Sequence, residues 1–119
     1  MSETAGQAYT PSQPLRQLAL LELASDGTIQ VATPMAESLL GRPPSDLIGR
    51  QFFAFLDENS FFRKVLAEMV KGERETTRTR TWLFLGEQAE QWLDISGALV
   101  RDANGEVGHL SLVLTDPSH

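Results

Sequence analysis

The chain has 119 residues, the length of one domain with its own core, and its content of 41% hydrophobic and 22% charged residues is typical of a folded globular protein. A formal net charge of −6 disfavours direct binding of nucleic acid, because neutralising phosphates requires a basic surface. The absence of cysteine excludes disulfides, thiolate nucleophiles, cysteine-ligated metals and cysteinyl-flavin photochemistry, and it favours the reducing cytoplasm as the setting.

Residues 1–18 precede the predicted domain. Residues 1–14 are rich in Ser, Thr, Gln, Ala and Pro, a composition that buries too little apolar surface to fold by itself. Leu15 and Leu18 follow at the spacing of one helical turn, so the segment is either a polar tail or a short capping helix. No signal peptide and no apolar run of roughly 18–20 residues is found in the sequence, so we expect no membrane role.

A β-hairpin is predicted at the start of the domain. Residues 19–24 are apolar and lead into Asp26-Gly27, a dipeptide that favours a tight turn between two strands. Residues 28–32 then form the second strand.

Two short helices with a rigid bend between them are predicted in residues 34–50. Thr33 caps the first helix, Pro34 suits its first position, and Gly41 ends it in a left-handed conformation. After two prolines, Ser45 is expected to cap a single turn over residues 46–48, which Gly49 closes.

A longer helix is predicted over residues 61–70. Residues 57–60 (Asp-Glu-Asn-Ser) form a capping cluster before it, and Gly72 ends it. Its apolar side chains recur at spacings of three and four and define one buried face: Phe62, Val65, Leu66 and Met69.

Beyond Gly72 the apolar period changes to two, which predicts three strands over residues 73–85, 91–100 and 107–115. Residues 86–90 are a polar turn, and Asn104-Gly105 marks a second one. The order indicates an α+β fold: a five-stranded antiparallel sheet with the helices inserted between strands two and three and packed on one face.

Five segments of this chain resemble the PAS domain family of signalling modules. Residues 26–29 (Asp-Gly-Thr-Ile) resemble its Asp-Gly-x-Ile hairpin, residues 34–41 its Asn-Pro-Ala-Ala-Glu-x-Leu-Leu-Gly helix, and residues 45–50 its Ser-x-x-Glu-Leu-Ile-Gly-Lys segment. Residues 101–107 are similar to its Arg-Asp-x-x-Gly-x-Val turn, and residues 115–116 carry the Thr-Asp at which family members open an exit linker. The resemblance implies a PAS-like domain over residues 19–116, with the exit linker beginning at 117–119.

The resemblance also implies a function. PAS domains sense signals and dimerise, and they pass the signal to a C-terminal effector such as a kinase, a cyclase, a phosphatase or a DNA-binding domain. That effector is not part of this chain, so we expect the chain to come from a longer regulator. The family's frequent Asn before the first helix is Thr33 here, which removes an amide that could bridge strand and helix. The haem-binding branch uses a His on the long helix, and residues 61–70 contain none.

No cofactor is predicted, and a non-covalently held flavin or small metabolite stays open as the alternative. Strand alternation separates an inner sheet face, toward the helices, from an outer one. The inner face is either a closed core or a ligand pocket. The candidate pocket residues combine three threonines with apolar side chains: Thr33, Leu39, Leu40, Leu66, Met69, Thr79, Thr81, Leu93, Ile95 and Leu112.

The outer face is predicted to carry an apolar patch that is too large to leave in contact with water. It is covered either by the chain's own N-terminal segment, including Leu20, or by a second copy in a homodimer, and both can hold. The candidate interface residues are Leu15, Leu18, Trp82, Phe84, Trp92 and Val113.

Neither catalysis nor metal binding is expected. His109 lies on the outer face and His119 is terminal, so no hydrolytic triad can form on the inner face. The acidic residues also lack a regular ligand spacing. The sequence therefore predicts a non-catalytic sensory and dimerisation domain of a signal-transduction regulator.

Overall fold

The computed structural model describes residues 18–84 and 90–117. Its elements follow the predicted order, with two 3₁₀ turns, η2 and η3, between the helices: β1 (Ala19–Ala24), β2 (Ile29–Ala32), α1 (Pro34–Leu40), η2 (Pro44–Asp46), η3 (Phe52–Phe55), α2 (Phe61–Val70), β3 (Thr76–Phe84), β4 (Glu90–Arg101) and β5 (Val107–Thr115).

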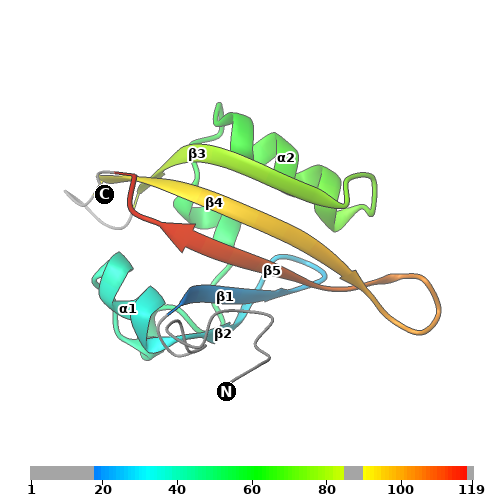
Figure 1. Ribbon diagram of the computed structural model, residues 1–119, viewed down its shortest axis with the longest axis horizontal. Helices are drawn as coiled ribbons and strands as arrows, with labels where there is room; N and C mark the ends of the chain where they lie inside the picture. The colour runs from blue at the N-terminus through cyan, green and yellow to red at the C-terminus, as the bar shows by residue number, and fades with distance from the viewer. Residues whose placement is uncertain (1–17, 85–89, 118–119) are drawn as a thin grey trace, which may run out of the picture.

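The five strands form one antiparallel sheet in the order β2-β1-β5-β4-β3 (Figure 1). The first strand therefore pairs with the last, and the helical segment connects the two edge strands. Helix α1 contacts β1, whereas α2 contacts β3 and β5. This is the predicted α+β arrangement, and the fold prediction is confirmed.

The first hairpin forms at the predicted turn. Gly27 has φ 95°, and a Cβ placed there would lie 2.9 Å from the Phe53 ring, so the turn requires glycine. The Asp26 carboxylate accepts the Thr28 N–H at 2.9 Å, and this hydrogen bond lowers the pKa of Asp26. Strand β2 begins at Ile29, because Thr28 bridges to Gln51 instead.

Helix α1 begins and ends as predicted, with Thr33 as its N-cap and Gly41 in the left-handed conformation at φ 68°. The prediction that Ser45 caps the next turn is wrong. That turn is the 3₁₀ helix η2, which begins at Pro44 with Pro43 in the cap position and without a side-chain cap. Proline at both positions sets the backbone before Ser45 is reached.

A second 3₁₀ turn, η3, was not predicted. It buries Phe52 and Phe55, and Phe52 meets Phe62 of α2 edge to face at a ring separation of 6.3 Å. Arg63 of α2 donates to the carbonyl oxygens of Phe53 and Leu56 at 2.7 and 3.2 Å and stacks over the Phe53 ring. The turn is therefore held by tertiary contacts with α2.

Helix α2 matches the predicted residues, with Ser60 as its N-cap. Its four predicted core side chains are all buried: Phe62, Val65, Leu66 and Met69. They pack on the inner sheet face, where the alternate residues Leu93, Ile95 and Leu99 of β4 and Leu110, Leu112 and Leu114 of β5 are also buried. The predicted division of β4 and β5 into inner and outer faces is confirmed.

Strand β3 is shorter than predicted and β4 slightly longer. The turn between β4 and β5 is held by Asp102, whose carboxylate accepts the N–H groups of Asn104 and Glu106, and by the Gly105 N–H, which donates to the Asp102 carbonyl. Within the described residues, no helix is long and apolar enough to cross a membrane.

Candidate functional site

The inner face holds the candidate pocket residues from three sides of the core. Leu39 and Leu40 come from α1, with Thr33 as its N-cap; Leu66 and Met69 come from α2, and the others from the sheet. The aliphatic members are packed together in the hydrophobic core, with Leu39 only partly buried: Leu40, Leu66, Met69, Leu93, Ile95 and Leu112. The question of a closed core or a ligand pocket therefore depends on the three threonines.

The Thr33 hydroxyl is fully used by the protein itself. It donates to the Leu18 carbonyl, accepts the Leu20 N–H at 2.9 Å and accepts the Ala36 N–H at 3.4 Å. A hydroxyl has one proton and two lone pairs, so no hydrogen-bonding capacity remains for a ligand. The amide of the family's Asn is absent as predicted from the sequence, and the Thr33 hydroxyl itself joins β1 to α1.

Thr79 and Thr81 also have partners within the chain. The Thr79 hydroxyl lies 2.9 Å from that of Thr77, and the Thr81 hydroxyl lies 3.3 Å from that of Ser60. Each of these two hydroxyls shares one hydrogen bond and keeps further acceptor capacity, so among the three candidate threonines only Thr33 is fully used. The other candidate residues are aliphatic and offer no hydrogen-bond partner to the polar edge of a flavin ring, so the lining fits a flavin poorly.

The outer face of the sheet carries a cross-strand tryptophan pair. Trp82 of β3 lies opposite Trp92 of β4, and the rings meet edge to face at 4.7 Å with an interplanar angle of 79°. Trp92 is 50% exposed and Phe84 is 37% exposed. Two large aromatic side chains on the sheet thus stay in contact with solvent in the isolated chain.

Val113 does not belong to this aromatic cluster. It lies between Leu20 of β1 and Ser96 of β4, whereas Trp92 is four residues away from Ser96 along β4. A polar row containing the Arg80–Asp94 pair lies between the two groups. The outer face therefore has two separate apolar areas, and the predicted continuous patch is corrected. Leu20 belongs to β1 itself and is part of the second area.

The Arg80–Asp94 pair joins β3 to β4 on the outer face. The Arg80 Nε donates to the Asp94 carboxylate at 2.9 Å. This hydrogen bond lowers the pKa of Asp94 and raises that of Arg80. Arg78, two residues earlier, makes no side-chain hydrogen bond or ion pair in the part of the chain that the structure describes.

A groove of about 470 Å³ runs along the edge of β3. Because β3 is the last strand of the sheet, side chains of both its faces reach this edge. The groove brings together Thr79 and Thr81, predicted for the inner pocket, with the aromatic residues predicted for the outer interface. Its lining comprises Asp57, Ser60, Phe61, Phe62, Thr79, Arg80, Thr81, Trp82, Phe84 and Trp92.

Five groove residues were not predicted as site residues, namely Asp57, Ser60, Phe61, Phe62 and Arg80, and Phe61 is the exposed aromatic residue among them. It is the first residue of α2 and is 66% exposed. Its position beside the buried Phe62 was the available signal, since one of two neighbouring aromatic residues at a helix start must point away from the core. Of the other predicted interface residues, Leu18 is partly buried, and Leu15 lies outside the described residues.

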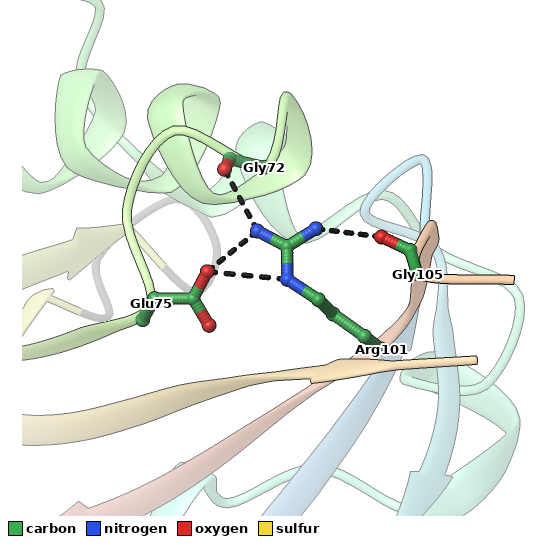
Figure 2. A network of polar contacts seen from close by, with 4 residues as sticks. All are labelled: Gly72, Glu75, Arg101 and Gly105. Carbon is green, nitrogen blue, oxygen red and sulfur yellow. Dashed lines mark hydrogen bonds and ion pairs between the residues drawn. The ribbon is translucent and has the colours of Figure 1, made fainter. Parts of the chain in front are cut away.

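Arg101 holds the opposite end of the sheet together (Figure 2). Its guanidinium donates to the Gly72 carbonyl at 3.0 Å, to the Gly105 carbonyl at 2.8 Å and to the Glu75 carboxylate. One side chain of β4 thus connects the end of α2, the start of β3 and the β4–β5 turn. This role was not predicted from the sequence.

No group of three metal-ligating side chains comes together in residues 18–84 and 90–117. The chain matches the family described as PAS fold over residues 19–117. The chain belongs to the PAS family. No curated protein matches it in sequence.

Several solved structures share the fold of this PAS domain. The PAS domain from the fruit-fly ELK potassium channel has a TM-score of 0.73 at 8% identity and covers 91% of this chain and 93% of that chain. The LOV domain of the Erythrobacter litoralis EL346 blue-light activated histidine kinase has a TM-score of 0.70 at 13% identity, covering 83% and 94%. The PAS domain of an HTR-like protein from Haloarcula marismortui has a TM-score of 0.66 at 14% identity, covering 88% and 90%.

Proposed function

We propose that this PAS domain is the sensory and dimerisation part of a cytoplasmic signal-transduction regulator and has no catalytic activity of its own. Membership of a family of generally sensory, non-catalytic modules supports the sensory role. Strand β5 ends at Thr115, beside the first strand of the domain, so a shift in the core can reach whatever follows Asp116 through the sheet. The effector that receives the signal is a kinase, a cyclase, a phosphatase or a DNA-binding domain.

The observation that carries the dimer is the exposed tryptophan pair. Trp82 fixes Trp92 by an edge-to-face contact, so Trp92 presents half of its surface in one defined orientation. Ordering this side chain costs little further entropy on association, and Trp is the residue most enriched among interface anchors. A second copy of the chain packed on this face would bury the Trp82–Trp92 pair of each copy.

The test is the mass of the full chain and of Trp92→Glu by light scattering. We expect the parent chain to be a dimer and the variant to be a monomer at the same concentration. Loss of a central Trp contact costs about 2 kcal/mol or more, which raises the dissociation constant about thirty-fold. Ile48→Glu is the matched control, because Ile48 is 43% exposed but precedes Gly49, which donates to Ile29 of β2 at the opposite edge of the sheet from β3.

An unchanged mass in folded Trp92→Glu would contradict the dimer. A parent chain that is monomeric, with Trp fluorescence that shifts to the red in the double variant Leu15→Glu/Leu18→Glu, would instead support coverage of the sheet by the N-terminal segment.

The alternative function is the sensing of a small molecule held between sheet and helices. One observation favours it: Gly97 leaves the inner face of β4 without a side chain, and the Met69 methyl lies 3.5 Å from where its Cβ would be. An unbranched Met can change rotamer and open space there. The aliphatic lining of the inner face favours an apolar guest over a flavin.

Native mass spectrometry and an absorbance spectrum of the purified chain test this alternative. A bound mass that disappears on unfolding, or a visible chromophore, would support it. A colourless chain of the mass of the polypeptide alone, whose melting temperature does not change across a metabolite panel, would contradict it.

A further inference from the structure

The free edge of β3 offers backbone hydrogen-bonding groups in a defined pattern. The Leu99 N–H donates to the Glu75 carbonyl at 2.8 Å, directly before the first paired residues of the β3–β4 ladder. In an antiparallel ladder, hydrogen-bonded pairs alternate with non-bonded ones. The odd-numbered residues of β3 therefore bond to β4, and the even-numbered Thr76, Arg78 and Arg80 direct their N–H and carbonyl groups away from the sheet.

Only the C-terminal end of this edge is covered in the described part of the chain. The isolated bridge between Leu56 and Leu83 closes it there. Residues 76–81 remain open within the described part of the chain, and the groove with Phe61 and Phe62 at its inner side lies beside residues 79–81. A strand added at this edge would thus meet apolar side chains on the inner side and two arginines on the outer side.

A second copy of the chain fits this edge poorly. In a two-fold antiparallel pair centred on Arg78, that residue faces its own copy, and centring on Thr79 places Arg78 opposite Arg80. Centring on Arg80 again opposes identical charges, and centring on Thr77 brings Arg80 opposite Arg74. Like charges directly opposite each other destabilise a strand pair, so each of these four registers is disfavoured.

We propose that the open edge of β3 binds an extended segment of a partner protein, with alternating acidic and apolar residues, as a sixth strand. The acidic side chains pair with Arg78, whose guanidinium makes no hydrogen bond or ion pair within residues 18–84 and 90–117, and with the outward side of Arg80. The apolar side chains of the same segment point into the groove beside Phe61. Backbone hydrogen bonds to Thr76, Arg78 and Arg80 fix the register. This inference does not depend on the dimer proposed above.

The probe is a capped synthetic peptide of about seven residues with alternating Val and Glu, which is added to the full chain. Amide hydrogen exchange measured by NMR reports on the edge directly. We expect exchange at Arg78 and Arg80 to slow in proportion to the bound fraction. Exchange at Thr79 stays unchanged, because its N–H already bonds to β4.

Two matched controls separate backbone from charge. Methylation of the peptide nitrogens that face β3 should abolish binding, whereas methylation of the alternate nitrogens should leave it. Arg78→Gln should weaken binding about 1.5- to 5-fold, the range for one opposite-charge pair across strands. Neither control alters the β3–β4 ladder.

Equal binding of a Val-Lys peptide, or no slowing at Arg78 and Arg80 at saturating peptide, would overturn the proposal. Exchange at these amides that is slow without peptide and becomes slower as the protein concentration is raised would assign the edge to a second copy instead. Protection by oligothymidylate and not by the peptide would assign it to a nucleic acid.

Discussion

Thr33 shows how one hydroxyl can connect two elements that are formed by different rules. The residue is the N-cap of α1, and its backbone N–H also donates to the Leu20 carbonyl in the extension of the β1–β2 ladder. Its hydroxyl completes the connection with bonds to Leu18, Leu20 and Ala36. The entry angle of the helix over the inner sheet face is thereby tied to strand β1.

We expect Thr33→Val to destabilise the domain by about 1–3 kcal/mol, because it keeps the shape of the side chain and leaves partly buried backbone groups without their partner. Thr33→Ser keeps the hydroxyl and should stay within about 1 kcal/mol of the parent chain. Urea unfolding of both variants measures the difference. Equal stability of the Val and Ser variants would show that the hydroxyl contributes nothing.

At the scale of elements, Arg101 couples three segments that are distant in the sequence. The end of α2, the start of β3 and the β4–β5 turn all contribute an oxygen to its guanidinium. Gly72 and Gly105 both have positive φ, so the two carbonyls are presented by turns that only glycine forms readily. A planar fork with five donors suits this arrangement, and a lysine cannot reproduce it.

We expect Arg101→Gln to cost more stability than Glu75→Gln. The first change removes the bonds to both carbonyls as well as the ion pair, whereas the second removes the ion pair alone. Because Arg101 and Glu75 are substantially exposed, the pair itself should contribute no more than about 1 kcal/mol. A double-mutant cycle by urea unfolding measures the coupling, and equal costs for the two single variants would contradict the role given to the carbonyls.

At the scale of the whole molecule, the strand order separates the two surfaces for which different partners are proposed. Strands β4 and β3 present the tryptophan pair on the face of the sheet, where a second copy can pack. The edge of β3 presents arginines and open backbone groups, which oppose a second copy in the registers considered and form the site proposed for an acidic strand. A dimer on the face and a partner strand on the edge are therefore compatible, and the groove beside Phe61 lies where they meet.

The sequence by itself determined the elements and the faces. The period-two pattern separated buried from exposed residues on β4 and β5, and the glycines and caps set the ends of α1 and α2, because these signals depend only on neighbours along the chain. The resemblance in five short segments was sufficient for the family. The turn η3 was not predictable from local signals, because contacts with α2 hold Phe52 and Phe53 in place.

Only the tertiary structure decided which surfaces these residues form. Alternation placed Val113 and Trp92 on one face, but the register between β4 and β5 sets them four residues apart. On β3, Thr79 and Thr81 were predicted for the inner pocket, and Trp82 and Phe84 for the outer interface. Because β3 is the edge strand, all four side chains border one groove. Register and strand order are fixed by pairing between distant segments. The composition of a single strand carries no information about either.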